Sequence, residues 1–271
     1  MSSLKKTLGV AAVLADIMLL NTGCFSGVVD LDDDFTHSGN VEAAAEFSRI
    51  LPLGSQSAIR VFGANGSIHV WGDPTAQEVT LKGVRRVRSD THSDARAHLP
   101  NLRVEATARP SEIEIRTVQP RNADGRSYLV DYDISVPAHL AASVTNGNGT
   151  VLIDGLVADV DVTNGNGKVE LVDVEGSHWV SLGNGELSAW AHLPAGGKIV
   201  HSVGNGSVFL SVQPQVSASF GARVGNGTIT LTGLDLHQVV SGERELKGVL
   251  GSGDGLIDLS AGNGQIRVQG G

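Results

Sequence analysis

A repeated Asn-Gly pair is the feature that most constrains the fold of this chain. Counted from Asn148, the first pair of the series, the successive spacings are 18, 18, 21, 21 and 37 residues. The last interval is about two units long, and we interpret Asp254-Gly255 within it as a related turn. A period near 20 residues is typical of a solenoid or repeat array, in which each unit packs on its neighbours. The pairs begin at Asn148, Asn166, Asn184, Asn205, Asn226 and Asn263, with an earlier copy at Asn65.

Apolar side chains hold fixed positions around each pair. Three and five residues after the Asn they recur in each copy, as Val169 and Leu171 do after Asn166. Four and six residues before it they recur as well, as in Val162 and Val160. A period of two predicts strands with one buried face. Each unit therefore consists of a strand, a glycine turn and a second strand.

Two all-β folds can use this unit. Asn-Gly between alternating strands is also typical of a tight hairpin, so an antiparallel β meander or sandwich has the same register. A solenoid also explains why the turn recurs at one phase, because equivalent Asn side chains of successive coils would stack in a hydrogen-bonded ladder. We predict a repetitive β-solenoid with coils of about 18–21 residues, with the antiparallel fold as the alternative.

The N-terminus is typical of an exported protein. Residues 1–23 combine an early Lys pair with an apolar run from Leu8 to Leu20, which is too short to span a bilayer. Cys24 is the only cysteine, and with Gly23 before it the segment resembles the lipobox of bacterial lipoproteins, although Asn21 stands where Leu is usual. The resemblance implies a lipid on Cys24, the membrane as a partner, and a cell-envelope protein anchored at the outer membrane.

The rest of the chain divides into three segments. Residues 24–50 hold an acidic run from Asp30 to Asp34 and predict a solvated tether, with one candidate helix at Val41 to Phe47. Residues 51–140 predict a less regular N-terminal part of the β body, in which Arg85 to Ala97 is a polar loop or short helix. Residues 141–271 contain the Asn-Gly series. The strands predicted before it are Ile59 to Val70, Val79 to Val87, Leu102 to Ala108, Glu112 to Thr117 and Tyr128 to Val136.

The sequence shows no clear catalytic, cofactor-binding or metal-binding pattern. None of its nine histidines has the spacing of a zinc motif, and His201 falls at an inward position, which favours a core residue. Asp254 and Asn263 lie nine residues apart, as in calcium-binding nonapeptide repeats, but the other turns carry Asn. We predict no enzyme, cofactor or metal site. A β-helical enzyme acting on polysaccharide is the alternative, with carboxylates at Asp154, Asp159, Asp161, Glu170, Asp173 and Glu175.

The charge of the chain excludes one class of partner. The net charge is −9, and it becomes −10 once residues 1–23, with two lysines and one aspartate, are removed. Such a surface repels polyanions, so we expect no nucleic-acid partner. An unknown protein or glycan remains as the partner, with self-association of the chain as a further alternative.

Three groups of motifs resemble one known family. They are the segment Asn65 to Trp71, the segment Ile134 to Pro137, and the serial Asn-Gly units that close with Gly251 to Gly255 and Asn263 to Ile266. Together they resemble the bacterial putative-adhesin family of unknown function, similar to head domains of putative autotransporter adhesins, over roughly residues 55–270. The resemblance implies a β-helical envelope lipoprotein that acts as a non-catalytic structural or adhesin-like binding scaffold.

Overall fold

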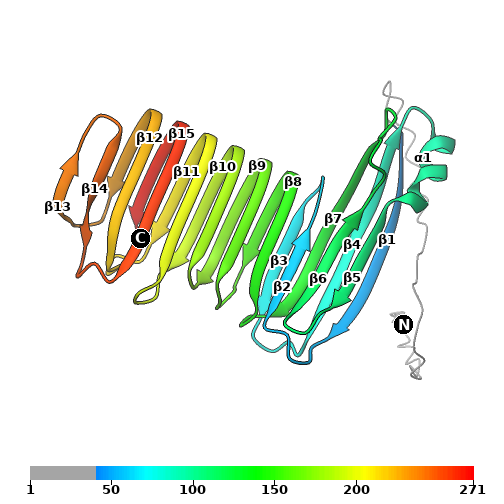
Figure 1. Ribbon diagram of the computed structural model, residues 1–271, viewed down its shortest axis with the longest axis horizontal. Helices are drawn as coiled ribbons and strands as arrows, with labels where there is room; N and C mark the ends of the chain where they lie inside the picture. Colours follow the sequence, from blue (N-terminus) through cyan, green and yellow to red (C-terminus); the bar gives the residue numbers. More distant parts are fainter. Residues whose placement is uncertain (1–40) are drawn as a thin grey trace, which may run out of the picture.

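A computed structural model describes residues 41–271 (Figure 1). In this range the chain is all-β, as predicted, and its strands form one large sheet that mixes parallel and antiparallel pairs. The short helix α1 (His92–His98) and a 3₁₀ turn (Leu99–Asn101) interrupt the strands. The predicted signal segment, Cys24 and the Asp30 to Asp34 run lie outside the described residues.

The N-terminal part of the sheet mixes antiparallel and parallel pairs. Strand β4 (Glu78–Ser89) lies between β1 (Val41–Pro52) and β7 (Ser127–Pro137) and is antiparallel to both. The antiparallel pairing of our alternative fold is thus present here, and again at the C-terminal end. Four shorter strands complete this part: β2 (Ala58–Phe62), β3 (Ile68–Asp73), β5 (Arg103–Ala108) and β6 (Glu112–Val118). The last two confirm predicted strands, whereas the predicted strand Ile59 to Val70 is divided into β2 and β3 by a bend at the first Asn-Gly pair.

Two sequence predictions fail in this region. Residues 41–50 were placed in the tether, with a helix at Val41 to Phe47, but they form most of strand β1. The reason is tertiary: Ala43 and Ala45 are buried in the core and β1 pairs with β4 along its whole length, which outweighs the helix preference of alanine. Residues Arg85 to Ser89 belong to strand β4, so only the later part of the polar interruption is helical.

The repeats form a stack of long parallel strands. Each strand bends at its Asn-Gly pair, where the glycine has a φ between 123° and 146°, and continues on the other side of the bend. Neighbouring strands pair in register around the bends, so that Asn166 lies opposite both Asn148 and Asn184. The strands are β8 (Ala141–Asp154), β9 (Val160–Glu175), β10 (His178–His192), β11 (Lys198–Val212), β12 (Ala218–Thr232) and β15 (Gly255–Gly270).

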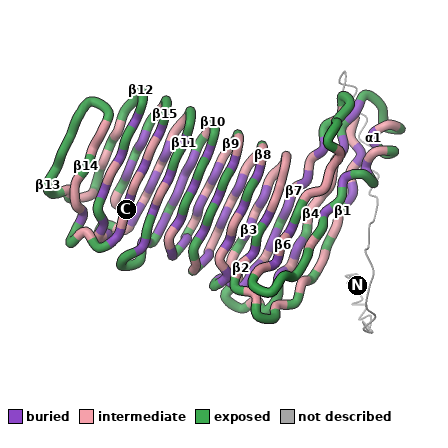
Figure 2. Tube along the Cα trace, viewed as in Figure 1, coloured by how far each residue is buried: buried purple, intermediate pink, exposed green. Residues whose placement is uncertain are grey.

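The predicted core positions are confirmed. Buried and exposed residues alternate along most of the repeat strands (Figure 2), and Val162 is fully buried while its neighbour Asp161 is exposed. Ile229 and Leu231 are only half-buried, because the second half of β12 is the last strand segment on its side of the stack. The buried downstream positions are Val151, Ile153, Val169, Leu171, Leu187, Ala189, Val208, Leu210, Ile266 and Val268.

The order of the last strands differs from the order in the sequence. Strand β15 lies between β11 and β12, and the hairpin of β13 (Leu236–Ser241) and β14 (Glu245–Leu250) covers the first half of β12. The interpretation of Asp254-Gly255 as a repeat turn was wrong. Asp254 lies in the loop before β15, where its carboxylate accepts hydrogen bonds from the hydroxyls of Ser217 and Ser252. The buried residues after it, Ile257 and Leu259, belong to the unit of Asn263.

Candidate binding surface

Seven asparagines form a continuous side-chain ladder along the stack. The amide Nδ2 of each Asn donates to the Oδ1 of the Asn on the neighbouring strand toward the N-terminal end of the stack, at 2.7–2.8 Å. At the N-terminal end, Asn65 instead donates to the backbone carbonyl of Tyr128 at 3.2 Å. The ladder therefore has one direction and one protein-capped end. In spatial order its members are Asn65, Asn148, Asn166, Asn184, Asn205, Asn263 and Asn226.

The glycines on both sides of each asparagine make this close stacking feasible. From Asn148 onward every copy reads Gly-Asn-Gly, whereas the first copy has Ala64 in the leading position. A Cβ on Gly185 would overlap the carbonyl oxygen of Gly167 on the neighbouring strand, and its φ of 137° disfavours any other residue. A side chain at these positions would thus force neighbouring strands apart.

Two further asparagines lie buried beneath the first bends, and the sequence analysis missed them. Asn146 Nδ2 donates to the carbonyls of Gly66 and Asn148 at 3.2 and 3.1 Å. Asn164 Nδ2 donates to the carbonyl of Gly149 at 3.0 Å. They occupy the position two before the ladder Asn, which is Leu, Val or Ala in later copies. An asparagine at a position that is apolar in later copies was the sequence feature that could have predicted a buried hydrogen-bonding role.

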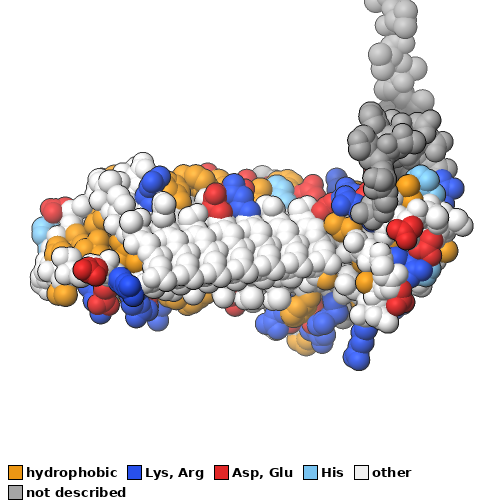
Figure 3. Space-filling view, turned by 90° about the horizontal axis from the view of Figure 1, so that it is seen from above, with side chains coloured by type: hydrophobic (Ala, Val, Ile, Leu, Met, Phe, Trp, Pro, Cys, Tyr) orange, Lys and Arg blue, Asp and Glu red, His pale blue; other side chains and the backbone are white. Residues whose placement is uncertain are grey.

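The outer surface of the bends is a long, flat and uncharged band. Seen from above in Figure 3, it crosses the stack without charged or hydrophobic side chains, which gather along its margins and at its ends. The Gly-Asn-Gly triplets provide this surface, because they contribute amide groups and backbone alone. We call it the Asn-Gly band. It offers a regular row of amide donors and acceptors on a protein whose net charge is −9.

A buried histidine pair lies inside the stack. His178 Nδ1 and His201 Nε2 are 3.1 Å apart, and the outer nitrogens of both rings are buried without a hydrogen-bond partner. Burial lowers the pKa of His178 to about 4, and burial together with the neighbouring His178 holds the pKa of His201 well below its usual value. His201 was predicted to face inward, and it does. His178 lies six residues before Asn184, which is also an inward position. Pairing of β10 with β11 therefore brings together two histidines that are 23 residues apart in the sequence.

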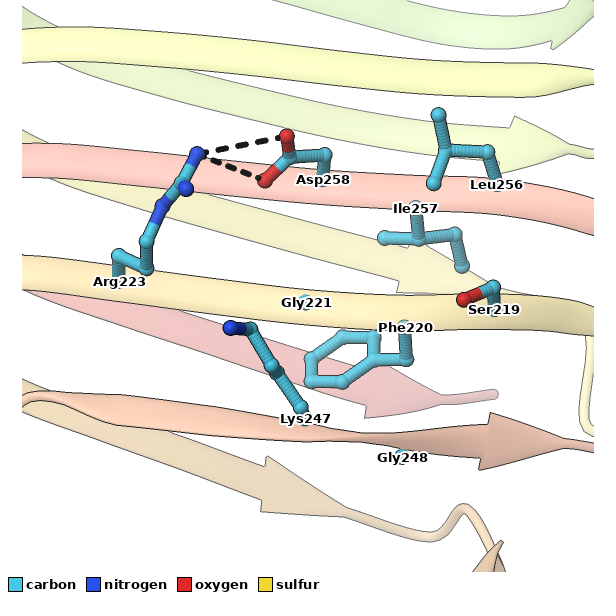
Figure 4. A pocket seen from close by; sticks show the side chains of 9 residues that line it. All are labelled: Ser219, Phe220, Gly221, Arg223, Lys247, Gly248, Leu256, Ile257 and Asp258. Atoms are coloured by element: carbon cyan, nitrogen blue, oxygen red, sulfur yellow. Dashed lines mark hydrogen bonds and ion pairs between the residues drawn. The ribbon is translucent and has the colours of Figure 1, made fainter. Parts of the chain in front are cut away.

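A surface hollow of about 250 Å³ lies between β12, β14 and β15 (Figure 4). Gly221 and Gly248 open it by lacking side chains, and Arg223, Lys247 and Asp258 surround it. Arg223 pairs with Asp258 at 3.3 Å, and Lys247 pairs with Glu245 at 2.6 Å. Its charges are thus already matched within the protein.

Charged groups elsewhere make structural ion pairs. Arg86 pairs with Asp131 and with Glu42, so the Arg85 to Ala97 segment offers less free positive charge than its sequence suggests. Arg126 pairs with Asp94 at 2.6 Å and lowers the pKa of that carboxyl. Among the carboxylates considered for an enzyme, Glu170 pairs with Lys168 at 2.5 Å. Residues 41–271 contain no group of three or more His, Cys, Asp or Glu side chains placed to hold a metal ion.

Within the same residues, no helix is long and apolar enough to cross a membrane.

No family model matches the chain, and no curated protein matches it in sequence. Solved structures that align with most of this chain have low sequence identity to it. A putative cell adhesion protein from Clostridium sporogenes shares 13% identity, with a TM-score of 0.49 over 84% of this chain and 100% of that chain. A putative adhesin from Bacteroides fragilis shares 12%, with a TM-score of 0.32 over 82% and 96%. A putative adhesin from Parabacteroides distasonis shares 10%, with a TM-score of 0.24 over 82% and 96%.

Proposed function

We propose that this protein is a non-catalytic binding scaffold of the bacterial cell envelope. A lipid on Cys24 holds it to the membrane, and its repeats form a solenoid that presents the Asn-Gly band to a protein or glycan partner. The parallel, in-register pairing of equivalent residues supports the solenoid. The observation that carries the proposal is the seven-membered ladder, which makes a flat surface along the length of the stack.

The construction of the band suits it to binding. Its side chains are already ordered by hydrogen bonds to each other, so a partner would gain contacts with little further loss of side-chain entropy. Each amide between the two ends of the ladder uses one donor and one acceptor site within it and keeps others for a partner. The shifted pKa values described above have structural causes, namely burial for the histidines and ion pairing for Asp94, and they do not require a catalytic role.

The band is tested by charging it without changing its shape. The wild-type chain and the double variant Asn184→Asp, Asn205→Asp would be compared in pull-downs from envelope fractions. We expect captured partner to fall at least tenfold in the double variant, since two carboxylates then interrupt the neutral row. Asn101→Asp, at an exposed site outside the band, is the matched control and should capture as the wild type does. Equal capture by all three proteins would reject the band as the binding surface.

The anchor is tested separately. Cells expressing the wild type should incorporate a labelled fatty acid into the protein, and Cys24→Ala should remove the label and the membrane association. An unlabelled wild-type protein would reject the lipid anchor while leaving the test of the band intact.

A further inference from the structure

Two aromatic residues meet on an outer face of the stack, away from the Asn-Gly band. Trp190 on β10 and Phe209 on β11 lie with ring centroids 5.7 Å apart and planes inclined by 57°. Both side chains point outward, because the residues flanking each of them are buried. Trp190 is 41% exposed. The two tilted rings therefore form an open apolar notch on the face made by the strand halves that follow the bends.

The strands around the notch have features that shape it. Ser188 pairs with Phe209 across the strands and faces outward, yet it is buried, so the side chains around it lie over the sheet instead of extending away from it. Opposite Trp190, strand β9 contains two residues, Val172 and Asp173, where the register shifts. Asp173 has a φ of 48°, an unfavourable value for a residue other than glycine.

Such a bulge re-aims the side chains beside it. The other parallel pairs among β8 to β12 and β15 keep an unbroken register. The irregularity in the stack thus coincides with the exposed tryptophan, as expected where local strain serves a site.

A third aromatic residue lies on the same face. Trp71 on β3 pairs with Asp154, which in turn pairs with Val172, so Trp71 and Trp190 share one row across the sheet. Three strand spacings separate them, which is about 14 Å. The indole N–H of Trp71 donates to Asp133 Oδ1 at 3.1 Å, which holds the ring in place while 37% of the residue remains exposed.

The polar groups around the notch favour a sugar ligand. A pyranose ring has an apolar C–H face that packs on an aromatic ring, and hydroxyl groups at its rim that need hydrogen-bond partners. Ser211 and Gln269 lie beside each other next to Phe209 and Arg267 and supply such partners. Glu170 is neutralised by Lys168 at 2.5 Å. The net charge of −9 would repel a polyanion.

We propose that Trp190, Phe209 and Trp71 form a binding site for an uncharged glycan chain that runs across the strands. This site goes beyond the proposed function, because it lies on a different surface from the Asn-Gly band and does not depend on the lipid anchor. Trp190 and Phe209 would hold one sugar ring, and Trp71 would hold a second ring further along the same chain.

Affinity electrophoresis of the purified full chain tests the site. Gels would contain hydroxyethylcellulose, galactomannan or dextran as uncharged polymers, and polygalacturonate as the anionic one. We expect at least one uncharged polymer to retard the protein. Trp190→Ala should raise the Kd at least tenfold and Trp71→Ala several-fold, while Trp190→Phe keeps most of the binding because a ring remains. Trp190→Phe also separates lost binding from lost folding.

Trp179→Ala is the matched control. Trp179 lies on the same strand with 36% exposure, but it faces outward from the half before the bend and should not affect retardation. The site is rejected if no uncharged polymer retards the wild type, if Trp179→Ala weakens binding as much as Trp190→Ala, or if polygalacturonate is bound most tightly. Equal partner capture by the wild type and the Asn184→Asp, Asn205→Asp variant, with intact glycan binding, would reject the proposed function alone.

Discussion

The N-terminal part of the sheet and the repeat stack are held together in different ways. In the stack, one set of contacts recurs from strand to strand, and the link between Asn166 and Asn148 is made again between Asn184 and Asn166. In β1, β4 and β7 each contact occurs once, as where Arg86 pairs with Asp131 and Glu42 or where Phe47 packs edge-on against Tyr132 at 6.0 Å. Repetition makes the stack depend on features shared by every repeat, whereas the N-terminal part depends on individual pairs.

The largest effect is expected from a charge in the repeated core. Val162→Asp would place an unpaired carboxylate in a fully buried position, and we expect a loss of about 4 kcal/mol or failure to fold. Asp161→Val, one residue away on the exposed side, should change the free energy of unfolding by less than about 0.5 kcal/mol. Urea unfolding of both variants measures this. Equal tolerance of the two substitutions would contradict the register of the stack.

A methyl group in a bend should be nearly as damaging. Gly185→Ala would bring a Cβ onto the carbonyl of Gly167 at a positive φ, and we expect a loss of about 3 kcal/mol. Gly221→Ala is the control within the same stack, because its Cβ would find nothing closer than Asp258 Oδ1 at 3.8 Å. Thermal melts should show a large drop for Gly185→Ala alone. Similar melting temperatures for the two variants would mean that the bends are not closely stacked.

Acid should weaken the stack through the buried histidine pair. Burial keeps His178 neutral in the folded protein down to a pKa of about 4, while the unfolded chain takes up the proton near pH 6.5. The free energy of unfolding is therefore unaffected by this histidine above about pH 7, and it decreases as the pH falls below that value. For His178 the loss is about 2 kcal/mol between pH 7 and pH 5.

Unfolding free energies measured across this range test the effect. The double variant His178→Leu, His201→Leu should lose less stability between pH 7 and pH 5 than the wild type. His192→Leu, at an exposed position on the same strand, is the control and should keep the wild-type slope. If the free energy of unfolding changes equally with pH in all three proteins, the histidine pair is not the cause of the loss of stability in acid.

The smallest effect is expected from one member of the ladder. Asn184→Asp keeps the shape of the side chain but cannot donate to Asn166, so one hydrogen bond is lost at an exposed site. We expect a loss of about 1 kcal/mol. Asn101→Asp, outside the ladder, should have no measurable effect in the same urea titration. Equal free energies of unfolding for the two variants would show that the ladder hydrogen bond does not contribute to stability.

The sequence predicted what the repeats share and little of what occurs once. Alternation around each Asn-Gly pair correctly identified the core. Apolar residues at every second position indicate which face of a strand is buried. It did not predict that β15 lies between β11 and β12, since Asn205 and Asn226 have the regular spacing of 21 residues. Strand β1 was missed because its partner β4 follows a long intervening segment and its own residues favour a helix.

The candidate surfaces follow the same rule. The Asn ladder was anticipated from the period. The meeting of His178 with His201, and of Trp190 with Phe209, depends on which strands are neighbours and on a bulge in β9, and neither of these is encoded in a local pattern.

The order of the strands is tested most directly by paired cysteines in a Cys24→Ser background. Equivalent positions on adjacent strands are about 5 Å apart, within reach of a disulfide, whereas positions two strands apart are separated by about 10 Å. Asn205→Cys with Asn263→Cys should therefore cross-link readily on mild oxidation, and so should Asn226→Cys with Asn263→Cys. Asn205→Cys with Asn226→Cys should not. Efficient cross-linking of the 205–226 pair, without the 205–263 pair, would show a stack in sequence order and contradict the structure described above.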